Sequence, residues 1–237
     1  MRNYFTFDDK ASTLYGVYIT GTGTYNAPER AYETINVPGR DGAVLGIEKH
    51  FENIELVYPA FIYSNFKGNL SNLKGMLMSK VGYKKLSDTY HPDEYRLAFY
   101  RGGMEVEART QHDAGQFDIV FECKPQRYLV SGDTVTTFTT SPGSISNPTS
   151  FTSRPIIRVY GYGTLTVNSN SITISQSTNS YVDIDSEVMD CYKGSVNMNG
   201  LVSFQANDFP TLIPGSNSIA FSGNITKVEV TPKWWKV

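Results

Sequence analysis

Apolar and polar residues alternate along much of the first half of the chain, and this pattern predicts short β-strands. Runs of this kind occupy residues 15–19, 54–58, 95–100, 104–109 and 116–123. Every second residue of the last run is apolar, from Phe117 to Cys123, so these side chains share one face. Glycine-containing turns separate the last three runs, which favours an antiparallel meander.

One segment of the first half has a helical period instead. Leu70, Leu73, Met76 and Leu77 fall on a single face of a helix over residues 65–81. Ser64 is a candidate cap for the start of this helix, and Gly82 is a candidate end. We expect the helix to pack on the meander through its apolar face.

The second half contains short strand-like runs at regular spacing, which is typical of a β-sandwich. The runs are residues 156–160, 163–167, 171–174, 181–185, 191–192, 218–221 and 226–231. Most charged residues lie before residue 135, and Ser, Thr and Asn replace them afterwards. This shift, with Pro142-Gly143 in the stretch 139–144, predicts two domains, residues 1–138 and 139–237. The predicted fold class is all-β with one helix, in two β-sandwich-type domains.

Composition excludes several classes of protein. The 16 tyrosines and 13 phenylalanines suit strands, and the net charge of −2 gives no basic footprint for a nucleic-acid ligand. No run of 18 apolar residues occurs, so we expect no membrane span. The N-terminal residues do not resemble a signal peptide, which predicts synthesis in the cytoplasm. Cys123 and Cys191 fit neither a metal site nor a disulfide framework, and we expect two buried thiols and no cofactor.

Few side chains are candidates for chemistry. The three histidines are not spaced as metal ligands: His50, His91 and His112. Asp183, Asp185 and Glu187 alternate on one predicted strand face, where carboxylates could serve glycoside hydrolysis or bind calcium. The simpler interpretation is a solvent-facing side of the strand. We therefore expect no catalytic residue, no metal site and no enzyme.

Two further motifs have a structural and a functional interpretation. Trp234 or Trp235 could stack on a sugar ring, or one of them could close the core of the second domain. Successive strand residues point to opposite faces, so only one of the pair can serve either role on a given face. Gly161-Tyr162-Gly163 lacks the third glycine and the helix of a dinucleotide site, so it predicts a turn.

A sharp turn between two strands is predicted where Pro38-Gly39 and Asp41-Gly42 follow each other closely. Arg40 and Asp41 within it form either a surface ion pair or a contact between copies of the chain. In the second case, charge reversal at either residue disturbs assembly more than folding.

The sequence resembles the distal tail proteins of siphophages and prophages of Gram-positive bacteria. The stretches that carry the resemblance are VPGRDG (37–42), YKKLSD (83–88), HPDEYR (91–96), FDIVFECKPQRYL (117–129), NP (147–148), PIIRVYGYG (155–163), DIDSE (183–187) and FPTLIPGSN (209–217). Together they cover nearly the whole chain in a fixed order.

The resemblance implies a structural virion protein at the distal end of the tail. Such proteins form a hexameric ring through their N-terminal domains, while the C-terminal domain is a galectin-like, jelly-roll sandwich. The ring joins the tail tube protein to the tail-tip adsorption apparatus, with a tail-associated lysin or tip protein, the tape measure protein or a receptor-binding protein as further partners. A closed ring needs head-to-tail contacts between two different surfaces of one domain.

Two other hypotheses remain open from the sequence. One is a carbohydrate-binding protein that contributes to recognition of the host cell wall, with Trp234 or Trp235 as the stacking surface. The other is a glycosidase that uses Asp183 or Asp185.

Overall fold

The computed structural model describes residues 2–21, 23, 25–109, 113–176 and 180–237, and their contacts define two compact units. The first unit extends to Arg127, and the second comprises Tyr128–Lys236. Residues 128–138 belong to the second unit, because strand β12 (Thr136–Phe138) pairs with strand β22 (Lys227–Thr231). The sequence-based division after residue 138 assigned this segment to the first domain.

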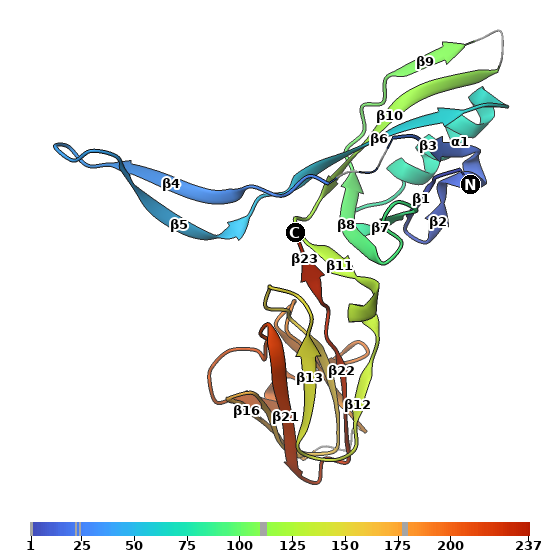
Figure 1. Cartoon of the computed structure of the whole chain (residues 1–237). Coiled ribbons are helices and arrows are strands. Elements are labelled where there is room, and N and C mark those ends of the chain that lie inside the picture. The colour runs from blue at the N-terminus through green and yellow to red at the C-terminus, as the bar shows by residue number, and fades with distance from the viewer. Residues whose placement is uncertain (1, 22, 24, 110–112, 177–179) are drawn as a thin grey trace. The chain divides into compact units, whose positions relative to one another are not determined.

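The first unit is built on one curled antiparallel sheet (Figure 1). Its elements are β1 (Phe5–Phe7), β2 (Lys10–Ala11), a 3-10 helix (Ser12–Tyr15), β3 (Val17–Ile19), β4 (Arg30–Asn36), β5 (Ala43–Phe51), β6 (Ile54–Ile62), α1 (Phe66–Met78), β7 (Lys84–Asp88), β8 (Glu94–Tyr100), β9 (Val106–Arg109) and β10 (Ala114–Cys123). The sheet follows the order β2-β1-β7-β8-β10-β6-β3, and β9 extends the pairing of β10. Strands β4 and β5 form a separate two-stranded sheet.

The core of the first unit lies between this sheet and α1. Alternate residues of β6 and β10 point inward, including Tyr58 and Phe121. Helix α1 covers them with Phe66, Leu73, Met76 and Leu77. The sequence therefore predicted both the helix and its buried face correctly.

The start of α1 differs from the sequence-based expectation. Ser64 does not cap the helix; Asn65 precedes it in a left-handed conformation, with φ of 46°. The Phe66 amide instead donates a 3.0 Å hydrogen bond to the Asp113 side chain, which lies at the turn into β10. The helix ends at Met78, before Gly82. A residue 47 positions away thus replaces the local cap.

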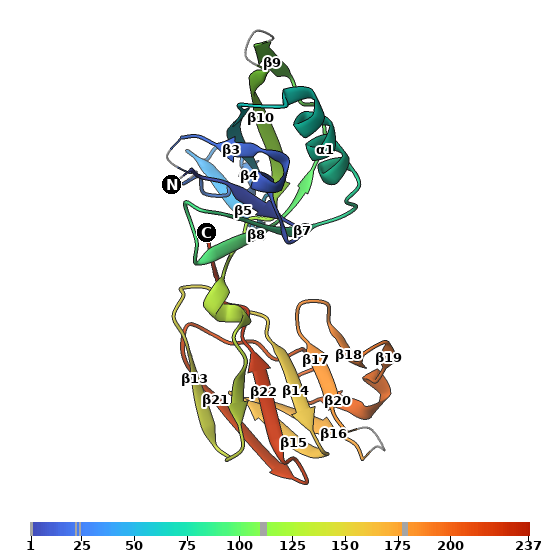
Figure 2. The same cartoon turned by 90° about the vertical axis from the view of Figure 1, so that its right-hand side faces the viewer.

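The second unit is a sandwich of two antiparallel sheets (Figure 2). One sheet has the order β12-β22-β14-β17-β18-β19, and the other has β13-β21-β15-β16-β20. Besides β12 and β22, the elements are β11 (Arg127–Leu129), 3-10 helix Val130–Asp133, β13 (Gly143–Asn147), β14 (Ile156–Tyr160), β15 (Gly163–Val167), β16 (Asn170–Ile174), β17 (Val182–Asp185), β18 (Asp190–Lys193), β19 (Val196–Asn197), 3-10 helix Asn199–Leu201, β20 (Val202–Phe204), β21 (Gly215–Gly223) and β23 (Trp235–Lys236).

The two sheets enclose their own apolar core. Its members come from both sheets and include Ile157, Leu165, Ile184 and Val228. Cys191 lies in this core and Cys123 in the first, and burial raises the pKa of each thiol to about 12. Both cysteines are free and buried, as predicted. The all-β fold with one helix is confirmed.

Candidate functional site: the β4–β5 hairpin

Strands β4 and β5 form a long hairpin that extends away from the sheet of the first unit (Figure 1). Gly39 and Gly42 supply the left-handed backbone of its turn, with φ of 80° and 79°. The Arg40 amide donates a 3.2 Å hydrogen bond to the Val37 carbonyl and closes the turn. The predicted turn between two strands is therefore confirmed, and it forms the tip of the hairpin.

The base of the hairpin is fixed to the sheet by side-chain amides. Asn53 Nδ2 donates to the Tyr83 hydroxyl at 2.8 Å and to Glu122 Oε1 at 3.0 Å. In the segment before β4, Asn26 Nδ2 donates to the Glu55 carbonyl at 2.9 Å. These contacts hold the place where the hairpin leaves the sheet, so its direction is set at the base.

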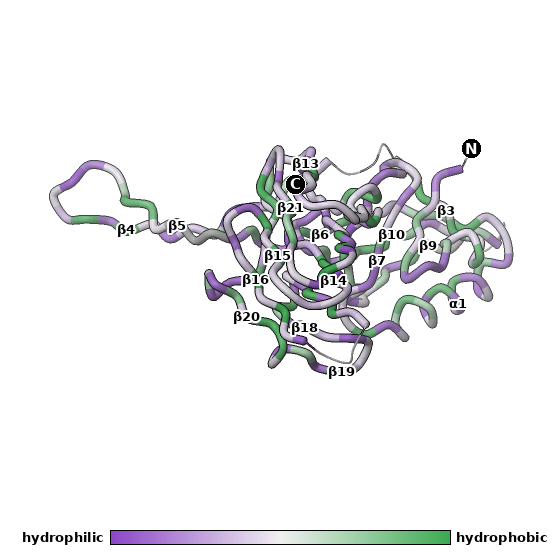
Figure 3. Tube along the Cα trace, turned by 90° about the horizontal axis from the view of Figure 1, so that it is seen from below, coloured by the Kyte–Doolittle hydropathy of each residue, from purple (hydrophilic) through white to green (hydrophobic). Residues whose placement is uncertain are grey.

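Both faces of the hairpin expose apolar side chains. Tyr32 and Leu45 lie on one face, named here the Tyr32 face, because their cross-strand register pairs Tyr32 with Ile47 and Thr34 with Leu45. They are 67% and 58% exposed. Ile35 and Val44 are directly paired on the opposite face, named here the Ile35 face, and are 47% and 36% exposed. Figure 3 shows apolar and polar residues mixed along both strands.

This arrangement is unfavourable for an isolated chain. A lone two-stranded hairpin is marginally stable in water, and soluble monomers seldom display apolar residues on both sides of such a ribbon. The outer edges of β4 and β5 also pair with no other strand among the described residues. The hairpin therefore offers two apolar faces and two strand edges for contact with other chains.

Arg40 and Asp41 lie at the tip of the hairpin, and both are exposed. A role of these two residues in contacts between copies stays a prediction. The sequence did not lead to a prediction for the exposed apolar residues of the hairpin, which are Tyr32, Ile35, Val44 and Leu45. Their signal was available, since apolar residues of β4 and β5 fall on both faces of a strand and cannot all face one core.

The carboxylates of β17 do not form a catalytic pair. Asp183 is only 4% exposed, and Arg158 donates to its two oxygens at 2.6 and 2.9 Å. Asp185 is also buried and accepts hydrogen bonds from the Glu187 amide and the Tyr192 hydroxyl. The predicted solvent-facing position of Asp183 and Asp185 is wrong, because side chains of β14 and β18 cover this part of the sheet. Both carboxylates are therefore engaged in hydrogen bonds within the second unit.

The two tryptophans have different environments. Trp234 is 5% exposed and belongs to the core of the second unit, so neither ring face is open to a sugar. Trp235 stacks on Phe151 with ring centroids 4.4 Å apart, and its indole nitrogen donates to the Thr152 carbonyl at 3.0 Å. Glycan stacking on Trp235 stays a prediction. Gly161 has a φ of 100° and lies in a turn, as predicted.

The described residues contain no cluster of three or more His, Cys, Asp or Glu side chains suited to a metal ion. His112 lies outside the described residues, and His50 is exposed near Glu52. Within the described part of the chain, no helix has the length and apolar character needed to span a membrane.

Two comparisons with known proteins found similarities to this chain. Residues 13–123 match the family model Sipho_tail, described as a phage tail protein RIFT-related domain. No curated protein matches the sequence. The crystal structure of Dit from phage SPP1, described as a paradigm of the hub adsorption apparatus in phages that infect Gram-positive bacteria, matches with a TM-score of 0.73 and 13% identity over 100% of both chains. Residues 13–123 therefore resemble a phage tail protein RIFT-related domain, and the chain has the fold of Dit.

Proposed function

We propose that the chain forms a hexameric ring at the distal end of the phage tail and joins the tail tube to the tail-tip adsorption apparatus. The observation that carries this proposal is the β4–β5 hairpin with exposed apolar residues on both faces. The match of residues 13–123 to a phage tail domain and the fold shared with a hub protein support it. The number of six copies comes from the resemblance to distal tail proteins.

The two faces of the hairpin favour a ring over a simple dimer. A two-fold dimer repeats one contact and would cover the Tyr32 face or the Ile35 face, leaving the other in water. Covering both faces with different neighbours requires a head-to-tail contact, and repetition of that contact closes a ring when the rotation fits. The edges of β4 and β5 can add backbone hydrogen bonds to the same contact.

Such a ring has two rims that differ in their residues, so it can bind different proteins above and below. The proposed partners are the tail tube protein on one rim and a tail-associated lysin or tip protein on the other. The tape measure protein and a receptor-binding protein are further candidates. Closure of the ring is expected at high protein concentration or in the presence of these tail partners.

The hairpin faces are tested by one charged substitution on each, Leu45→Asp and Ile35→Asp. Each should abolish ring formation, because a carboxylate cannot be buried there without a partner. Mass by light scattering over a wide concentration range, together with electron microscopy, measures the outcome. Val188→Asp is the matched control, because Val188 is an apolar residue of the second unit that is 63% exposed.

Mixing the two hairpin variants distinguishes a head-to-tail contact from a symmetric one. In a head-to-tail ring, the intact face of each variant can still form one junction, so the mixture should give dimers that cannot grow. A two-fold contact through a single face would yield dimers from one variant alone. Rings formed by Leu45→Asp and Ile35→Asp at wild-type concentrations would overturn the proposal.

A further inference from the structure

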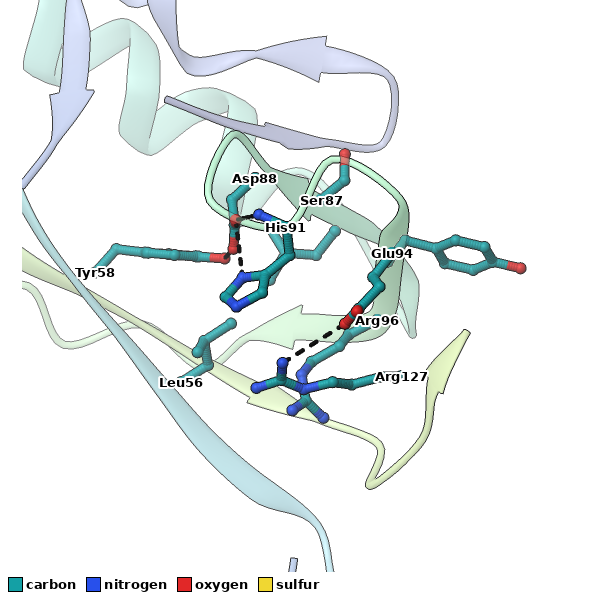
Figure 4. A pocket seen from close by; sticks show the side chains of 10 residues that line it. Leu56, Tyr58, Ser87, Asp88, His91, Glu94, Arg96 and Arg127 are labelled. Atoms are coloured by element: carbon teal, nitrogen blue, oxygen red, sulfur yellow. Dashed lines mark hydrogen bonds and ion pairs between the residues drawn. The ribbon is translucent and has the colours of Figure 1, made fainter. Parts of the chain in front are cut away.

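A small pocket opens in the first unit where the loop between β7 and β8 meets β6 and Arg127 (Figure 4). It has a volume of about 20 Å³. This is enough for one water molecule or a single carboxylate group, and too little for a sugar or a nucleotide. Three stretches quoted for the family resemblance, residues 83–88, 91–96 and 117–129, contribute to its walls.

Asp88 orients the histidine of this pocket. Its Oδ1 accepts hydrogen bonds of 2.9 Å from the Tyr90 and His91 amides, and its Oδ2 accepts one of 2.6 Å from the Tyr58 hydroxyl. Oδ1 also lies 3.2 Å from His91 Nδ1. Because a carboxylate only accepts, Nδ1 carries the proton in this contact. The second ring nitrogen of His91, Nε2, is buried and has no hydrogen-bond partner.

Arg96 brings a second unsatisfied group to the same pocket. Its side chain is 6% exposed, and Nη1 donates to the Pro125 carbonyl at 3.2 Å. Its Nη2 is buried without a partner. Burial, followed by the nearby charge of Arg127, lowers the pKa of Arg96 to about 10. The guanidinium still carries its charge at neutral pH, so Arg96 places a buried positive donor in the lining of the pocket.

The acidic groups around the pocket have other partners. Glu94 forms an ion pair with Arg127, at 3.5 Å. Asp88 is occupied by Tyr58, Tyr90 and His91. Buried charged donors are normally paired, and leaving one unpaired destabilises a protein. An acceptor that carries negative charge would therefore satisfy the free donor of Arg96.

We propose that this pocket binds a carboxylate, one oxygen of which accepts from Arg96 Nη2 while the other accepts from His91 Nε2. The second contact requires a proton on Nε2. The groups that face His91 are Asp88, Glu94, Arg96 and Arg127, and the ring of Tyr25 lies edge-on to it at 5.2 Å. The carboxylate belongs either to a small free acid or to an acidic side chain of a neighbouring protein chain.

Sodium formate is the probe, because it is the smallest carboxylate. Titration of the full chain, followed by the NMR signals of the His91 ring and the Arg96 guanidinium, should give saturable binding with a Kd on the order of 1 mM. Arg96→Gln should weaken binding at least ~10-fold, and a loss of 1.4 kcal/mol corresponds to that factor.

Two further variants separate a loss of formate binding from a loss of folding. His91→Gln keeps a polar side chain and should weaken formate binding. Arg101→Gln is the matched control, since Arg101 is an exposed arginine of the first unit that contacts Glu122 at 3.4 Å. It should bind formate as the wild type does. If Arg96→Gln does not fold, the His91→Gln comparison decides.

Three outcomes would overturn the proposal. The first is the lack of saturable formate binding, which leaves a water-filled pocket, and the second is equal binding of inorganic phosphate or chloride. The third is an equal affinity of His91→Gln and Arg101→Gln for formate. The source of the carboxylate follows from a comparison of dissociated and assembled protein. Formate binding to both forms indicates a small free acid. Binding to the dissociated form alone indicates an acidic side chain supplied by a neighbouring chain.

Discussion

At the scale of single residues, Gly161 occupies a position that other residues cannot adopt without strain. Its φ is 100°, and a Cβ atom there would collide with the Asn224 carbonyl. Gly194 also has a positive φ, of 59°, but a Cβ atom at that position meets open space. Alanine substitutions at Gly161 and Gly194 therefore separate the free-energy cost of a steric collision from that of the backbone conformation alone.

Gly161→Ala should lower the free energy of unfolding of the second unit by about 3 kcal/mol, because both strain and collision oppose it. Gly194→Ala should lower it by about 1 kcal/mol, the cost of the conformation alone. Both tryptophans of the chain lie in the second unit, so tryptophan fluorescence during denaturation measures this difference. Equal effects of the two variants would contradict the collision.

Residue environments were the least predictable part of the structure. Asp183 alternates with apolar neighbours and so looked exposed, yet Arg158 on the adjacent strand covers it. The proposed carboxylate pocket could not be predicted from the sequence for a similar reason, since Tyr58, Asp88 and Arg96 come from three different strands. Such sites depend on which strands become neighbours, and a single sequence does not specify that order.

At the scale of elements, helix α1 depends on a distant side chain. The Asp113 carboxylate accepts from the Phe66 amide and so satisfies one of the free donors at the start of the helix. It also connects the turn before β10 to α1. A cap contributed from elsewhere in the chain couples the two elements, and the sequence around Ser64 gave no sign of it.

Asp113→Ala should destabilise the first turn of α1 by about 1 kcal/mol, because the Phe66 amide loses its acceptor. Hydrogen exchange of the amides at the start of α1 should become about fivefold faster, consistent with that loss. Asp113→Asn retains a side-chain oxygen and should stay close to the wild type. Unchanged exchange in the alanine variant would show that the contact contributes no stability.

Elements with regular alternation were predicted well. The strands at residues 156–160 and 163–167 have the predicted bounds, and α1 lies within the predicted range of 65–81. Strands with a weak pattern were missed. Phe5–Phe7 is too short to show a period, and Gly143–Asn147 is mainly serine, glycine and asparagine. Pairing with neighbouring strands forms these elements, and their own residues do not signal it.

At the scale of the whole molecule, each unit has its own apolar core. Among the described residues none belongs to both cores, and the buried residues of the first core end at Cys123 while those of the second begin with Phe138. We propose on this basis that the chain has two domains that fold separately. The predicted division after residue 138 would cut β12 away from β22, whereas a division before Tyr128 keeps both sheets of the sandwich intact.

A fragment of residues 128–237 should therefore fold without the first unit. Its tryptophan emission should be blue-shifted, since Trp234 is buried in that core, and its denaturation should be cooperative. A fragment that begins at residue 139 lacks β12 and should be less stable or unfolded. Red-shifted emission from both fragments would show that the sandwich needs the first unit.

The β4–β5 hairpin also has a consequence for the life of the protein before assembly. A two-stranded hairpin with unpaired edges and exposed apolar faces can pair with the β-strands of other chains, including unrelated or misfolded ones. Gly39 and Gly42 at its tip and Glu33 along its length reduce this hazard, since glycine and charge both disfavour stacked fibrils. The protein is therefore most prone to aggregation between its release from the ribosome and its assembly with neighbouring chains.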